Sequence, residues 1–197
     1  MSSGPDPSQP LEPSAADRER GADGVSLQAH LPLAWRVSGR PEGQAPELMA
    51  ENQTVLRALL ALDDADESAG AEPRDRRGAP EIERRLDLLL LMVSSAIRQL
   101  VPMPPPRLCT LTAQGLAWQS AEPIGIGAWG ELHLYLRPRL PVALVLPAQV
   151  EQAQALSEGA WRVRARFSGL PDSLAALLEQ FVFRHHRRRV ARQRAAG

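Results

Sequence analysis

The second half of the chain alternates apolar and polar residues with a period of two, which is typical of β-strands. Residues 108–111 and 116–118 flank a turn at residues 112–115, and residues 131–137, 142–150 and 161–167 predict three longer strands. The last of these, WRVRARF, would place its apolar side chains inward and three arginines outward. With a first strand at residues 31–37 there are about six strands, enough for a small barrel or a strongly bent sheet.

Three other segments repeat apolar residues at helical spacing: residues 47–63, 80–101 and 171–194. The last should cover one end of the β domain. The second is bounded by the prolines of residues 102–106 and follows a charged, Gly- and Pro-containing stretch, residues 64–80, that we predict to be a flexible loop. It contains a coiled-coil seam spaced 4, 3, 4, 3, 4, formed by Ile82, Leu86, Leu89, Val93, Ala96 and Leu100.

One helix cannot bury the apolar face that contains this seam without a partner. We therefore expect self-association through this helix, with the amphipathic segment 47–63 as a pairing helix; the alternative is packing on the chain's own β domain. Residues 1–26 are rich in Pro, Ser, Gly and charge and are expected to be disordered. No apolar run approaches the roughly 20 residues of a membrane span, and the N-terminus lacks the pattern of a signal peptide, so we expect a cytoplasmic protein.

Charge is divided unevenly between the two halves. Residues 1–101 hold 17 acids and 11 arginines, whereas residues 102–197 hold 6 acids and 12 arginines, and there is no lysine. Six of these arginines lie between Arg184 and Arg194. They favour an anionic partner such as a nucleotide, nucleic acid, lipid headgroup or acidic protein, or else form a solubilising, frayed helix end. Sequence-specific nucleic-acid reading is not expected, because aromatic residues do not alternate with the arginines.

Several chemical motifs are weak in this context. The string GIGAWG at residues 125–130 matches a dinucleotide fingerprint, but a strand rather than a helix follows it, so we predict a turn. His185 and His186 would point about 100° apart on a helix, so we expect them to be solvent-exposed and to bind no metal. Cys109 is the only cysteine and is expected to be a buried structural thiol. The sequence shows no acid–base pair and no nucleophile cluster that would indicate an enzyme.

The order of elements in the second half carries a resemblance. Thr110-x-Thr112-x-x-Gly115 lies at the first turn, where PilZ domains carry Asp/Asn-x-Ser-x-x-Gly, and the chain ends in a strand with a terminal Phe and a helix containing FVFR. Residues 106–192, with residues 31–37 as first strand, thus resemble a PilZ domain, the bacterial module that senses cyclic di-GMP. Arg36 and Arg40 match the Arg-x-x-x-Arg string that binds this ligand in the family. Here the string lies at the end of the first strand, whereas in the family it precedes the barrel.

The resemblance implies cyclic di-GMP as the ligand, no cofactor, and binding residues Arg36, Arg40, Thr110, Thr112 and Gly115. Two helices after the first strand are typical of atypical PilZ proteins of the xanthomonad type, in which heptad-bearing helices assemble a tetramer. The expected fold is α+β, a single atypical PilZ domain over residues 27–197. It comprises a small antiparallel β-barrel (main strands in residues 106–170), a two-helix insertion at residues 47–101 and a C-terminal helix.

The function implied is a non-enzymatic signalling adaptor that links cyclic di-GMP to signalling or pilus-regulating proteins. The alternative is an interaction module that binds no nucleotide and engages an acidic partner through its basic C-terminal helix.

Overall fold

A computed structural model describes residues 25–40, 45–69, 103–137, 140, 142–156 and 159–195. The elements in chain order are β1 (Leu27–Val37), α2 (Pro46–Ala69), β2 (Pro106–Leu111), β3 (Gly115–Ser120), β4 (Trp129–Leu134), β5 (Leu144–Ala155), β6 (Trp161–Phe167) and α4 (Asp172–Ala195). The α+β class is confirmed. The predicted helix at residues 80–101, with its seam, lies outside the described residues, as does most of the predicted disordered tail.

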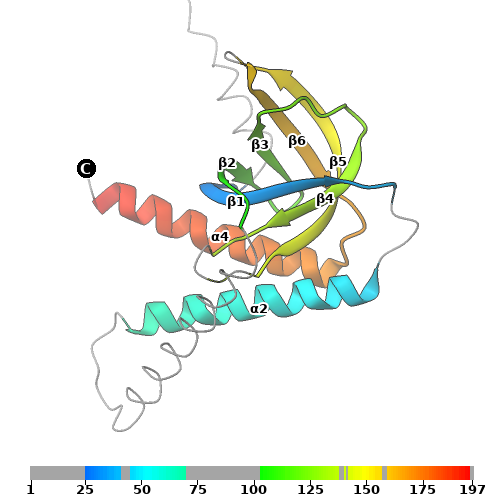
Figure 1. Ribbon diagram of the computed structural model, residues 1–197. Coiled ribbons are helices and arrows are strands. Elements are labelled where there is room, and N and C mark those ends of the chain that lie inside the picture. Colours follow the sequence, from blue (N-terminus) through cyan, green and yellow to red (C-terminus); the bar gives the residue numbers. More distant parts are fainter. Residues whose placement is uncertain are drawn as a thin grey trace, which may run out of the picture.

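The six strands form a closed antiparallel barrel in the order β1-β2-β3-β6-β5-β4 (Figure 1). Closure depends on β1, which pairs with β2 from Leu27 to Pro32 and with β4 from Leu33 to Val37. Pro32 lies where β1 changes partner, a position that suits a residue with no backbone N–H to donate. This double pairing of β1 joins the two ends of the sheet into a barrel.

Apolar side chains fill the barrel. In the predicted inward row of β6, Val163, Ala165 and Phe167 are buried and Trp161 is partly buried. Facing side chains from the other strands are 0–2% exposed: Leu33, Leu111, Leu116, Trp118, Leu132, Leu134, Leu144 and Leu146. The Trp118 and Trp35 rings pack with centroids 5.8 Å apart. Because the described side chains fill the barrel, we expect binding on its outside or at its ends.

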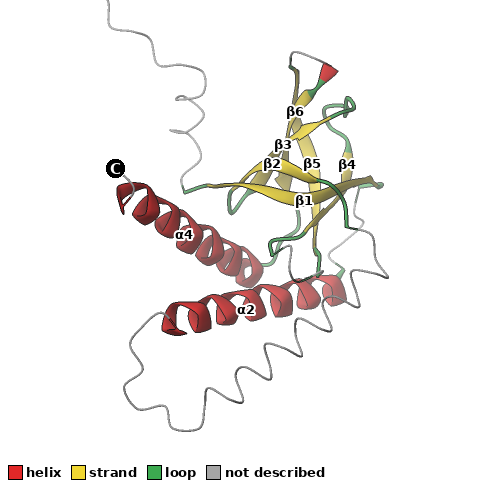
Figure 2. Ribbon diagram, turned by 60° about the vertical axis from the view of Figure 1, so that its left-hand side comes forward, coloured by secondary structure: helices red, strands yellow, loops and turns green. Residues whose placement is uncertain are grey.

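Two helices lie side by side across one end of the barrel (Figures 1 and 2). α2 contacts α4 and β5, and α4 also contacts β1, so the C-terminal helix shares with α2 the end that it was expected to cover. α2 buries Met49, Leu56, Leu59 and Leu60, and α4 buries Leu174, Leu178, Phe181 and Val182. Among the described residues, no helix is long and apolar enough to cross a membrane.

Several element boundaries differ from those predicted. β1 begins at residue 27 instead of 31, and α2 continues to residue 69, so that residues 64–69 are helical and not part of a loop. β4 ends at residue 134, although the sequence alternation continues to residue 137. The pairing of β4 with β1 stops at Leu33, because the preceding residues of β1 pair with β2 instead. β5 occupies residues 144–155 instead of 142–150; its polar end forms a ribbon with β6 beyond a register shift at Val150 and Gln152.

The glycine-rich string at residues 125–130 forms the predicted turn into β4. Gly127 has a φ of +84°, a conformation that favours glycine. No helix follows it, so the dinucleotide-binding reading is excluded on structural grounds.

Candidate functional site

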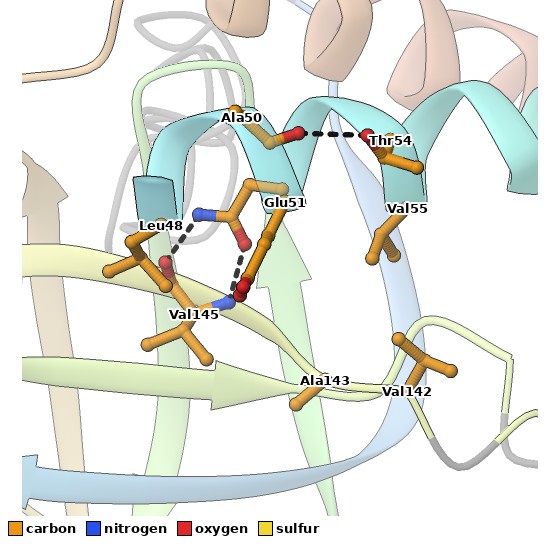
Figure 3. A pocket seen from close by; sticks show the side chains of 9 residues that line it. Leu48, Ala50, Glu51, Thr54, Val55, Val142, Ala143 and Val145 are labelled. Atoms are coloured by element: carbon orange, nitrogen blue, oxygen red, sulfur yellow. Dashed lines mark hydrogen bonds between the residues drawn. The ribbon is translucent and has the colours of Figure 1, made fainter. Parts of the chain in front are cut away.

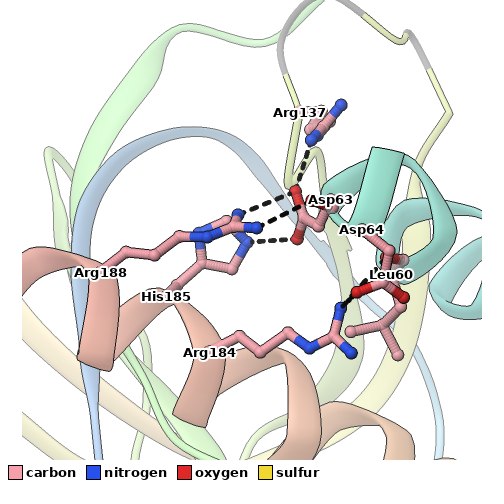
Figure 4. Close-up of polar contacts among 7 residues, drawn as sticks. All are labelled: Leu60, Asp63, Asp64, Arg137, Arg184, His185 and Arg188. Atoms are coloured by element: carbon pink, nitrogen blue, oxygen red, sulfur yellow. Dashed lines mark hydrogen bonds and ion pairs between the residues drawn. The ribbon is translucent and has the colours of Figure 1, made fainter. Parts of the chain in front are cut away.

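A buried carboxylate joins the two helices to the barrel. Asp63 on α2 is 0% exposed, and its side chain forms ion pairs with Arg137, after β4, and with Arg188 on α4, whose Nη1 lies 3.2 Å from Oδ1 (Figure 4). His185 Nε2 lies 3.0 Å from Oδ2, and Arg188 Nη2 also donates to the Asp63 backbone carbonyl at 3.0 Å. One carboxylate thus holds three segments that are distant in sequence.

The electrostatics of this cluster keep Asp63 charged. Burial raises the pKa of Asp63, but the hydrogen bond from Arg137 and the neighbouring positive charges outweigh burial and leave the pKa below its ordinary value. Burial lowers the pKa of His185, and the charge of Arg188 lowers it further, against the opposing effect of Asp63. At neutral pH a neutral His185 therefore donates its Nε2–H to an ionised carboxylate.

The surroundings of α4 correct two expectations. His185 is not solvent-exposed but packed against Phe181 and Asp63, and His186 Nδ1 donates to the Ser26 carbonyl at 2.9 Å. The arginines do not form a frayed end: Arg184 pairs with Asp64, Arg188 pairs with Asp63, and Arg189 donates to Gln28. The reason is that α4 lies against α2 and β1 along much of its length.

Sequence reasoning missed Asp63, although the sequence contains one signal for it. Asp63 follows Leu56 by seven residues, which places it on the buried, apolar face of α2. A carboxylate on such a face needs a cationic partner. Nothing in the sequence says that this partner comes from α4, 122 residues further along the chain.

Beside this cluster lies a groove of about 620 Å³ between α4, the C-terminal part of α2 and the start of β1. We call it the basic groove. In the part of the chain that the structure describes, its charged lining consists of Arg137, Arg188, Arg189 and Arg192, with Asp63 as the only carboxylate. Arg189 donates to the backbone carbonyl and the side-chain Oε1 of Gln28, at 3.3 and 3.1 Å.

A second hollow, the apolar groove, has a volume of about 450 Å³ and lies between α2 and the chain leading into β5 (Figure 3). Leu48 and Val55 of α2 and Val142 line it. At its base the buried Asn52 amide donates to the Val145 carbonyl at 2.6 Å and accepts from the Val145 N–H at 2.9 Å. Asn52 thereby makes the two hydrogen bonds that the backbone of a neighbouring strand would otherwise make at this point of β5.

The three motif residues of the first turn lie together. Thr112 Oγ1 accepts from the Gly115 N–H at 3.0 Å and closes the turn between β2 and β3. Gly115 has a packing role, because a Cβ there would lie 2.4 Å from the Ala165 carbonyl oxygen. Thr110 is half-buried and lies between Gln28 on β1 and Ala117 on β3.

The structure does not bring Arg36 and Arg40 to this turn. Arg36 opposes Glu131 on β4, and the guanidinium of Arg40 lies 5.7 Å from the centre of the Trp129 ring. Gln28, which opposes Thr110, is eight residues from Arg36, about 26 Å along a strand. The arginine that opposes Gly115 in register is Arg166 on β6, which sequence reasoning placed outward but assigned to no site.

Cys109 behaves as expected of a structural thiol. It is buried, and burial raises its pKa to about 11, so the sulfur is protonated at neutral pH.

The family model described as "Atypical PilZ domain, cyclic di-GMP receptor" matches residues 56–195, well over half of the chain. The chain belongs to this family. Among solved structures it is similar to a pathogenic protein from Xanthomonas campestris, described as a tetrameric PilZ domain self-assembled via an unusual helical bundle. The two are 27% identical with a TM-score of 0.74, and the match covers 90% of this chain and 96% of that one. No curated protein matched significantly.

Within this atypical PilZ domain the matched segment includes most of α2 as well as the barrel strands from β2 onward and α4. The family match therefore includes Asp63 and all of its charged partners, whereas Arg36 and Arg40 lie before it. Membership of a receptor family makes the outside of the barrel and the grooves beside its helices the places to look for binding.

Proposed function

We propose that this protein is a non-enzymatic signalling adaptor, linked to cyclic di-GMP signalling, that self-associates through its inserted helices. The observation that carries the proposal is the barrel filled with apolar side chains and closed by docked helices. Such a domain offers surfaces and shallow grooves, which suit recognition, whereas an enzyme needs reactive groups converging on a secluded cleft.

Self-association is supported by the apolar groove. Leu48 and Val55 on α2 are only partly buried, and Val142 opposite them is 48% exposed. A helix of a second copy, carrying the predicted seam, has the apolar chemistry to cover them. The similar Xanthomonas protein is described as assembling through a helical bundle, which favours the same use of the helices here.

Light scattering on the full chain tests self-association. Leu89→Arg puts a charge in the predicted seam and should give smaller particles than the parent. Ser94→Arg adds the same side chain just outside the seam and should keep the parent's mass. A monomeric parent, or a Leu89→Arg variant that is folded and keeps the parent's mass, would refute self-association through this helix.

Direct sensing of cyclic di-GMP is a separate part of the proposal, supported by the family and by Thr110, Thr112 and Gly115 at the first turn. Calorimetry with the purified full chain tests it. Loss of a binding signal in Arg36→Ala/Arg40→Ala would mean that these residues come together with the turn when the ligand is bound. Absence of binding at high ligand concentration would favour an interaction module that engages an acidic partner through α4.

A further inference from the structure

We propose that the basic groove binds a phosphate-bearing small molecule through arginines of α4, at a place that neither Arg36 nor the first-turn motif marks. The proposal goes beyond the adaptor function, because it assigns a binding site and a class of ligand, phosphate esters in general. It starts from the position of α4, which contacts β1 and contributes Arg188, Arg189 and Arg192 to the groove. Figure 4 shows Arg188 of this helix facing Asp63.

The charge balance of the groove favours an anion. Among the described residues, four arginines and one carboxylate line it, so with His185 neutral this lining has a net charge of +3 (4 − 1). Asp63 is fully buried beneath the arginines. An anion entering the groove thus meets guanidinium groups from two segments, after β4 and on α4.

The arginines are also held in place before a ligand arrives. Asp63 holds Arg137 and Arg188, and Gln28 holds Arg189 through two hydrogen bonds. Arg192 is exposed and follows Arg188 by four residues, which places both on one face of the helix. Positioned guanidinium forks lose less side-chain entropy on binding and match the geometry of a phosphate group.

The size and the polar lining indicate a small molecule. About 620 Å³ lies within the usual range of ligand pockets, roughly 300–1,000 Å³, and exceeds what one phosphate needs. Gln28 and Gln193 add amide groups that can donate to or accept from a polar ligand. A cyclic dinucleotide is one ligand of the proposed class, since it carries phosphate groups as well as polar bases.

Calorimetry on the full chain at low ionic strength tests the proposal with two probes, inorganic pyrophosphate and cyclic di-GMP. Arg189→Gln/Arg192→Gln removes two groove charges, and Arg187→Gln/Arg194→Gln removes two exposed charges from the same helix outside the groove. We expect the parent to bind at least one probe. The groove variant should bind it at least about tenfold more weakly, and the control should change it much less.

The probes separate possible ligands. Binding of pyrophosphate alone supports the groove while assigning it to a phosphate ester other than cyclic di-GMP. Binding of cyclic di-GMP alone, weakened in the groove variant and not in the control, supports it as a nucleotide site. If neither probe binds, if both arginine pairs weaken binding equally, or if neither pair weakens it, the groove is not a site. The self-association proposal is unaffected by that result, because it is measured separately by particle mass.

Discussion

Replacing Asp63 with alanine removes the counterion of two arginines and the hydrogen-bond partner of His185. Breaking a fully buried ion pair costs about 3–5 kcal/mol, because the remaining charge is left without a partner. Here the arginine side chains are 24–25% exposed, so water recovers part of that loss once the carboxylate is gone. We therefore expect the free energy of unfolding to fall by about 2–3 kcal/mol.

Urea unfolding of the full chain at a fixed protein concentration measures this loss. Asp64→Ala is the matched control: Asp64 is the next residue, also pairs with an arginine of α4, but is 57% exposed. Its removal should cost only about 0–1 kcal/mol. If Asp63→Ala is no less stable than Asp64→Ala, Asp63 does not anchor the helices and the reasoning about its burial is wrong.

Three further predictions concern stability. Asn52→Ala leaves the N–H and the carbonyl of Val145 without their partner and should cost about 2–3 kcal/mol in urea unfolding. Gly115→Ala forces a Cβ against the Ala165 carbonyl and should cost about 1–3 kcal/mol by the same assay. Because the pKa of His185 is lower in the folded chain, the unfolded chain takes up this proton first. Stability should therefore fall as the pH drops below about 6.5, and less steeply in His185→Gln.

Each of the three has a matched comparison. Gln53→Ala removes an exposed amide next to Asn52, and Gly125→Ala adds a methyl group where no atom lies within 4 Å. Equal losses in test and control variants would contradict the assigned contacts. For the histidine, identical slopes of stability against pH in the parent and His185→Gln between pH 5 and 7 would show that another group titrates.

Much of the fold follows from periodicity, since one buried face fixes the phase of each strand and helix. WRVRARF is the clearest case: it forms β6 with the predicted bounds and faces. Strand ends are less predictable because they depend on neighbours. The sequence alternation at residues 131–137 continues beyond the point where β4 stops pairing with β1. The polar end of β5 becomes a strand only because β6 pairs with it.

The sites are harder to predict because they combine distant segments. Thr112 and Gly115 close a local turn, so their proximity can be read from spacing. The Arg36 and Arg40 string has suitable spacing, but the course of β1 carries it to the other end of the strand. The partner of His185, Asp63, lies in the first helix of the insertion, 122 residues earlier, so the sequence around His185 shows no sign of its burial.

The Asp63 cluster and the basic groove share Arg137 and Arg188, so they are not independent. Each guanidinium has five N–H donors, enough to serve both a buried carboxylate and an anion in the groove. Asp63→Ala should therefore have opposite effects on two measurements: stability falls, while the affinity for a phosphate probe rises. The loss of the carboxylate's repulsion of an anion outweighs the looser positioning of Arg137 and Arg188, which Asp63 no longer holds. A cluster with only a structural role would lower stability and leave the affinity of the folded variant unchanged, so calorimetry on Asp63→Ala below its unfolding temperature decides between the two.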